Sequence, residues 1–158
     1  MFSVLQKLLK NYSDIPPPKL ENISLPRRYA GKYVSSIQTI FIDESQSVNL
    51  AIEICHEFEH HWQFINFPEQ YLFWENPSNF DFYQLCCKES CCPLEEDAYM
   101  FGNSLGRKNR RFLVELIEVS ELEKYAKCLD YQALKNRINH LTMQNLAKQN
   151  VQRILSLG

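Results

Sequence analysis

Two histidines one helical turn apart constrain this chain of 158 residues more than any other feature of its sequence. They lie in the segment His56-Glu-Phe-Glu-His60. Residues four apart in a helix are separated by about 40° around its axis, so His56 and His60 project from one face. Two imidazole nitrogens placed in this way can bind a single zinc ion at about 2.0–2.1 Å. The segment therefore predicts a helix that carries two ligands of a metal site.

Glu57 follows the first of these histidines, so it flanks the metal without binding it. Its carboxylate can accept a proton from a water molecule that the metal has made acidic. An H-E-x-x-H segment with this division of roles is typical of hydrolases. A surface helix with incidental histidines and carboxylates is the alternative that the pattern leaves open.

The residues around the motif favour a helix that is anchored in a core. Turn and cap residues, Asp43–Ser47, precede it, and Leu50, Ile54 and Cys55 give it an apolar face. These signals predict a helix from Val48 to about Ile65.

Extended and irregular segments flank this helix. Ile37–Ile42 is rich in β-branched and aromatic residues and is the best strand candidate. The stretch before it, up to Ser36, is interpreted as a loop with short extended pieces. Phe67–Phe82 contains prolines and many aromatic residues without clear periodicity, which predicts a long binding loop or lid, or a loop that packs its aromatic side chains on the core.

The remaining pattern is helical, and together these elements define an α+β fold. We expect one domain, residues 1–158, in which a small sheet packs on the H-E-x-x-H helix. The core motifs span residues 33–102, and residues 107–158 form a helical C-terminal part. The expected helices are Met1–Tyr12, ended by Pro16, Pro17 and Pro18, then Pro93–Ser104, Arg111–Lys127 and Tyr131–Leu155.

Two histidines need a third protein ligand, because a catalytic zinc site has three protein ligands and one open position. A third histidine at the metzincin spacing would lie six residues after His60, where the chain has Asn66. The glycine position of that pattern holds Gln63. The metzincin pattern is therefore excluded, and the remaining option is a carboxylate from a later helix.

The segment Leu94-Glu-Glu-Asp-Ala-Tyr-Met-Phe-Gly102 resembles the ligand helix E-x-x-A-x-x-F-(A/G) of the ImmA/IrrE-type metallopeptidases and related short gluzincins. These enzymes are distant relatives of thermolysin. Matched position by position, the resemblance makes Glu95 the third ligand, Ala98 the small residue one turn later, and Phe101-Gly102 the trailing pair. A small residue at position 98 lets two helices approach closely enough to share one metal ion.

This resemblance covers roughly residues 33–102 and implies a zinc-dependent peptidase with a zincin-like fold. His56, His60 and Glu95 would then hold one catalytic Zn²⁺, and Glu57 would be the general base. The implied substrate is a protein or a peptide.

The resemblance also implies that the Ile37–Ile42 strand is the edge strand that borders the cleft and pairs with extended substrate. Thermolysin has an aspartate four residues after its glutamate ligand, whereas this chain has Tyr99. Asp97 is close by in the sequence but on a different helix face, so the partner that orients a histidine ligand is unassigned. Glu96 stays open as an alternative third ligand, because only the spacing to Ala98 favours Glu95.

A residue that stabilises the tetrahedral intermediate is also unassigned. The candidates share a side chain able to donate a hydrogen bond, and each has a structural reading as well: His61, Tyr83, Tyr99 and His140.

Six cysteines bear on the compartment. Four lie in one run, Cys86, Cys87, Cys91 and Cys92, and Cys55 and Cys128 stand alone. The sequence has no export signal and no apolar stretch of about 18 residues. We therefore expect a cytoplasmic protein with reduced thiols. A structural metal, a disulfide or a redox switch in the run is the open alternative, although C-C-x-x-x-C-C is not a usual zinc spacing.

The net charge of −2 gives no global basic field, so it favours neither a nucleic-acid nor a membrane partner. The local basic cluster Arg107, Lys108, Arg110 and Arg111 is interpreted as a solvated helix end.

Two other functional classes stay open. The first is a regulatory or scaffold protein that keeps the zinc fold without turnover, and Glu57 argues against it because a structural site needs no general base. The second is a helical protein-interaction module, in which Leu113, Leu116 and Ile117 would present a groove or a dimer face.

Overall fold

The computed structural model describes residues 2–27, 29–76, 79, 92–106, 118–128 and 130–155. The chain divides into two compact units, residues 1–68 with 97–110 and residues 69–96 with 111–158. Helix α5 (Pro93–Asn103) runs from the second unit into the first without interruption, and its residues from Asp97 on belong to the first.

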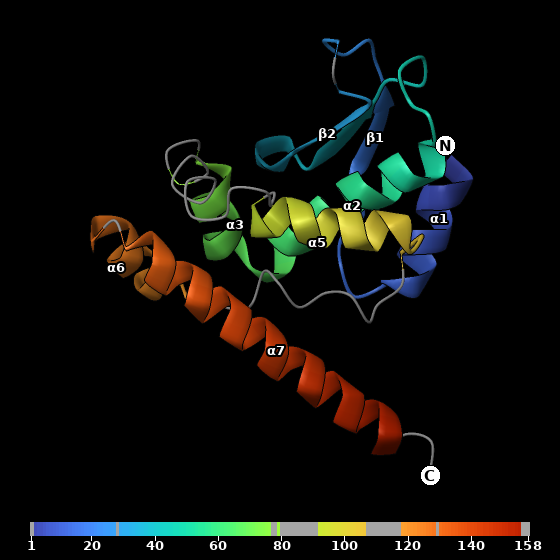
Figure 1. Ribbon diagram of the computed structural model, residues 1–158. Coiled ribbons are helices and arrows are strands. Elements are labelled where there is room, and N and C mark those ends of the chain that lie inside the picture. Colours follow the sequence, from blue (N-terminus) through green and yellow to red (C-terminus); the bar gives the residue numbers. More distant parts are fainter. Residues whose placement is uncertain are drawn as a thin grey trace. The chain divides into compact units, whose positions relative to one another are not determined.

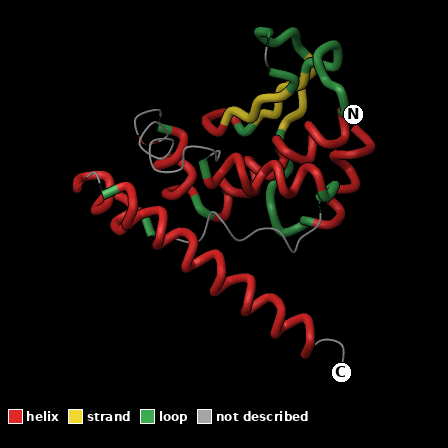
Figure 2. Tube along the Cα trace, in the orientation of Figure 1, coloured by secondary structure: helices red, strands yellow, loops and turns green. Residues whose placement is uncertain are grey.

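The first unit is an α+β arrangement, in agreement with the predicted fold class. A small mixed sheet packs on helix α2, and helix α1 packs on the same helix (Figures 1 and 2). Its elements are α1 (Phe2–Asn11), β1 (Lys19–Asn22), β2 (Gly31–Val34), the 3-10 turn η1 (Ser35–Ile37), β3 (Thr39–Ile42), α2 (Leu50–Asn66) and the continuation of α5.

The sheet has the order β1-β3-β2, with β1 parallel and β2 antiparallel to β3. Ile40 of β3 lies opposite both Leu20 and Tyr33. The prediction that Ile37–Ile42 is an edge strand is therefore wrong, because β3 is hydrogen-bonded on both sides and Ile40 is fully buried. The strand also starts later than predicted, since the 3-10 turn and Gln38, in the left-handed conformation, precede it.

Helix α2 forms where the sequence predicts it and is the centre of the first unit. Asn49 caps its N-terminus, with the side-chain Oδ1 accepting hydrogen bonds from the backbone of Ala51 and Ile52. Ile54 and Phe58, two of its own residues, are fully buried. This burial shows that the motif helix is a core helix, which removes the surface-helix alternative.

The turn between β3 and α2 is fixed by the carboxylate of Asp43. That carboxylate accepts hydrogen bonds from the backbone N–H of Leu25 and from the side chains of Ser45 and Gln46. These bonds, led by the one from Ser45, hold the pKa of Asp43 well below its ordinary value. Asp43 thus links the β1–β2 connection to the turn that precedes the motif helix.

Helix α1 forms as predicted and packs against the end of α5. The Tyr12 ring lies 5.8 Å, centroid to centroid, from the rings of both Phe58 and Phe101, and its hydroxyl donates to the carbonyl of Gly106 at 2.7 Å. Gly106 has φ +82°, and a Cβ there would lie 2.6 Å from Leu8 Cδ2. Glycine is therefore required at this close contact.

The second unit contains a helix that the sequence analysis missed. Residues Pro68–Glu75 form α3, so the prediction of a continuous loop from Phe67 is wrong in this part. Proline at the first helical position favours this start, because it needs no amide donor there. Phe80 and Phe82, at the end of the predicted loop, lie outside the described residues.

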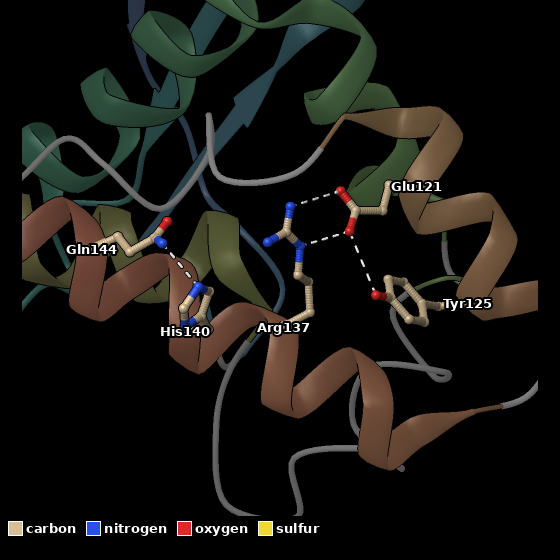
Figure 3. Close-up of polar contacts among 5 residues, drawn as sticks. All are labelled: Glu121, Tyr125, Arg137, His140 and Gln144. Carbon is tan, nitrogen blue, oxygen red and sulfur yellow. Dashed lines mark hydrogen bonds and ion pairs between the residues drawn. The ribbon is translucent and has the colours of Figure 1, made fainter.

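Helices α6 (Val119–Cys128) and α7 (Tyr131–Leu155) pack together in the second unit. Leu122, Leu134 and Ile138 are buried there. The Arg137 guanidinium of α7 bonds both carboxylate oxygens of Glu121 of α6, the shorter contact being 2.6 Å (Figure 3). Both side chains are partly exposed, so we assign this pair roughly 0–1 kcal/mol.

The bounds of α7 agree with the predicted helix, and α6 agrees with the described part of the helix expected from Arg111. Residues 107–117 lie outside the described residues, and they include the basic cluster and the three apolar residues of the proposed interaction face. Within the described ranges, no helix combines the length and the apolar character that crossing a bilayer requires.

Candidate metal centre

One ligand atom from each of His56, His60 and Glu95 lies within 4.8 Å of the other two. The Nε2 atoms of the two histidines are 3.1 Å apart. A tetrahedral zinc ion bound at 2.0–2.1 Å would separate two ligand atoms by about 3.3 Å. Both imidazoles are buried, which keeps water from competing at their nitrogens. The three side chains therefore fit a metal ion such as zinc.

Small residues on α5 allow this helix to lie close against α2. Ala98 is fully buried. At Gly102 a Cβ would lie 3.0 Å from the carbonyl oxygen of Ile52 and 3.3 Å from His56 Cβ, so a larger side chain would push on the backbone of α2. Glu95, Ala98 and Gly102 follow one another at spacings of three and four, which places them on one helix face. The small residues thus allow Glu95 to lie near the two histidines.

The two adjacent glutamates have different surroundings. Glu95 is partly buried and groups with the imidazoles, whereas Glu96 is exposed. The donor set in the structure therefore contains Glu95.

Behind the histidines lies a hydrogen-bond chain that the sequence analysis left unassigned. His60 Nδ1 donates to Gln63 Oε1 at 2.9 Å, and Gln63 Nε2 donates to Asp97 Oδ2 at 2.9 Å. Gln63 and Asp97 are fully buried. The first link could have been found in the sequence, because a residue three positions after His60 lies on the same face of α2. Nothing in the sequence indicates that Asp97 of α5 accepts a hydrogen bond from Gln63 of α2.

Tyr99 lies beside the first histidine. Its ring contacts that of His56 edge to face, with centroids 4.8 Å apart, and it is about half exposed. Tyr99 takes this place because it follows Glu95 by one helical turn. Among the described candidates for stabilising an intermediate, Tyr99 is the one whose ring contacts a side chain of the candidate metal centre.

His61 and His140 have other partners in the part of the chain that the structure describes. His61 is fully buried and structural, because its Nε2 donates to the carbonyl of Pro16 and its Nδ1 accepts from the Tyr33 hydroxyl. Burial lowers its pKa and keeps the ring neutral. His140 is exposed on α7, where Gln144 donates to it (Figure 3), and Tyr83 lies outside the described residues.

Glu57 is buried against the edge strand β2. A Cβ built on Gly31, the first residue of β2, would lie 2.8 Å from Glu57 Cγ and 2.9 Å from Glu57 Oε1. The missing side chain at Gly31 is therefore what makes room for the carboxylate in its present position. Nothing in the sequence indicates that this glycine faces Glu57.

Replacing Gly31 by alanine is expected to move the Glu57 carboxylate while leaving the fold and the metal in place. The atoms that a Cβ would meet are Cγ, Cδ and Oε1 of Glu57 and no backbone atom, so the side chain can give way and the thermal midpoint should change little. A displacement of about 1 Å at a reacting group can cost about 100-fold in rate. Zinc content, thermal unfolding and hydrolysis should be compared with the wild type. Unchanged hydrolysis, or loss of zinc, would contradict this account of Gly31.

Of the thiols that the structure describes, those of Cys55, Cys92 and Cys128, none belongs to this donor set. Burial raises the pKa of Cys55 to about 11, so its thiol stays protonated at neutral pH. Cys92 is buried and Cys128 is exposed. Cys55, Cys92 and Cys128 form no disulfide, in agreement with the prediction of reduced thiols, and this prediction stays open for Cys86, Cys87 and Cys91, which lie outside the described residues.

Comparison of the chain with protein-family models, with curated proteins and with solved structures finds no match. The structure defines the chain as an α+β protein with a possible metal site of two histidines and one glutamate. The resemblance to short gluzincins therefore depends on the residues themselves and on the way the fold brings them together.

Proposed function

We propose that this protein is a zinc-dependent peptidase, with His56, His60 and Glu95 as the metal ligands and Glu57 as the general base. The observation that carries the proposal is the convergence of three donor atoms from two helices within 4.8 Å. The position of Glu57, directly after His56 on the same helix, supports a hydrolytic role, since a purely structural metal site needs no base.

The donor set favours zinc. Two imidazoles and one carboxylate, with a fourth position left for water or substrate, are the ligands of catalytic zinc in several peptidases. When bound, a zinc ion supplies Lewis acidity, which polarises a carbonyl group and lowers the pKa of water.

The residues of the chain supply the remaining chemistry. The two histidines and Glu95 orient the site, and the partly buried setting limits the access of bulk water. Glu57 takes the proton from the attacking water and returns it to the departing amine as the peptide bond breaks. One carboxyl group thus serves as base and then as acid, so the proton balance closes within a turnover.

Peptide hydrolysis that depends on the metal tests this function. The purified protein is stripped of metal with a chelator, divided, and incubated with a mixture of peptides with and without one equivalent of zinc. New peptide termini, identified by mass spectrometry, should form only with zinc. Zinc binding without cleavage would instead support the regulatory or scaffold class.

A further inference from the structure

A buried amide connects the two helices that carry the metal ligands. Gln63, on α2, accepts from His60 Nδ1 through its oxygen and donates to Asp97, on α5, through its nitrogen, each contact being 2.9 Å. Gln63 and Asp97 are each 0% exposed. The chain His60–Gln63–Asp97 is therefore shielded from water along its length.

The direction of this chain follows from the chemistry of its last member. A carboxylate only accepts hydrogen bonds, so Asp97 requires the NH₂ group of Gln63 to face it. The Gln63 oxygen must then face His60, and an oxygen there requires a proton on Nδ1. A neutral imidazole with a proton on Nδ1 has its lone pair on Nε2. That Nε2 is the atom that faces the matching nitrogen of His56 at 3.1 Å.

We propose that Gln63 and Asp97 form a relay of hydrogen bonds with one fixed direction, from His60 Nδ1 through the Gln63 amide to the Asp97 carboxylate. This relay holds His60 in the tautomer whose Nε2 can bind the metal, and it fixes α5 against α2. Gln63 and Asp97 are positioning residues that act through His60. The inference rests on the metal-binding part of the proposed function and does not depend on the reaction catalysed.

Exchanging the amide of residue 63 and the carboxylate of residue 97 tests the direction of the hydrogen bonds in the relay. Gln63→Glu alone brings two buried carboxyl groups together, which either repel each other or must take up a proton from solvent. Asp97→Asn alone allows the Gln63 amide to turn around. The double variant Gln63→Glu with Asp97→Asn restores the direction, because the new carboxylate accepts from both His60 and Asn. All three variants keep nearly the original side-chain volumes.

Zinc affinity, measured by competition with a chromophoric chelator, is the readout. Losing an outer-shell partner of a metal ligand typically costs 10–100-fold in affinity. We expect a loss in this range for each single variant, and recovery to within about threefold of wild type in the double variant. Equal affinity in all four proteins, or a double variant as weak as the weaker single, would overturn the relay. Failure of the wild type to bind zinc would instead refute the proposed function.

A measurement on the unmodified protein does not depend on the variants folding. The ring nitrogens of His60 are observed by ¹⁵N NMR in the metal-free wild type above the pH at which the ring is charged. The relay predicts that Nδ1 carries the proton and that Nε2 does not. A proton on Nε2 would refute the relay, whatever the variants show.

Discussion

Replacing Glu57 by glutamine is expected to leave zinc bound and to abolish most of the hydrolysis. The amide has nearly the same volume as the carboxylate, so the packing against Gly31 is preserved. It cannot accept the proton of the attacking water, and general-base catalysis contributes about 10²–10⁴ in rate. The ratio of kcat/KM for wild type and variant, at equal zinc content, measures this loss.

The matched control is Glu53→Gln, the same substitution one helical turn earlier on α2. Glu53 is partly exposed and is not part of the donor set, so its variant should retain wild-type hydrolysis. A Glu57→Gln protein that cleaves peptides as fast as Glu53→Gln would show that another group is the base.

The second large effect is expected on zinc binding when Glu95 is replaced. Its neighbour on the first turn of α5, Glu96, provides the control. Glu95→Gln removes a charged ligand and should weaken zinc binding by more than about 100-fold, beyond the usual range for outer-shell partners. Glu96→Gln changes an exposed side chain and should bind zinc like the wild type. Zinc affinities of the two variants, measured side by side, decide between the two glutamates.

The opposite pattern of zinc affinities would contradict the assignment of Glu95 as a ligand. If Glu96→Gln loses zinc while Glu95→Gln keeps it, α5 presents the other side of its first turn to the histidines. The small residues at Ala98 and Gly102 would then no longer explain the site, because their spacing places Glu95, and not Glu96, on the face that meets α2.

Local patterns in the sequence were sufficient to predict the helices that matter most for the site. The motif helix and the ligand helix were expected at Val48–Ile65 and Pro93–Ser104, and the structure has them at Leu50–Asn66 and Pro93–Asn103. Cap residues, periodic apolar positions and a proline at the first helical turn are local signals, and they fix helices well.

Features that depend on contacts between distant segments were not predictable in the same way. The strand at Thr39–Ile42 was predicted, but its central place in the sheet depends on β1 and β2, which have only four residues each. Helix α3 was missed because its large side chains face both outward and inward: Leu72 is about half exposed, while Tyr71, Phe73 and Trp74 are buried. Such a segment shows no helical period.

The residues of the site likewise divide into those that local sequence patterns predict and those whose role depends on contacts between distant segments. The histidine pair and Glu95 follow from spacing and from a short resemblance, and the structure groups them. The roles of Gly31 and of the Gln63–Asp97 link required coordinates, because each arises where two elements meet in space. A glycine or a glutamine in a sequence carries no sign of the residue that it will face.

X-ray absorption spectroscopy of the zinc-loaded protein tests whether His56, His60 and Glu95 form the metal centre, because it reports the atoms bound to the metal. We expect one zinc per chain, bound only by nitrogen and oxygen at about 2.0–2.2 Å, with the scattering pattern of two imidazoles. Scattering from sulfur at about 2.3 Å would assign the metal to the cysteines, and would contradict a centre built from His56, His60 and Glu95.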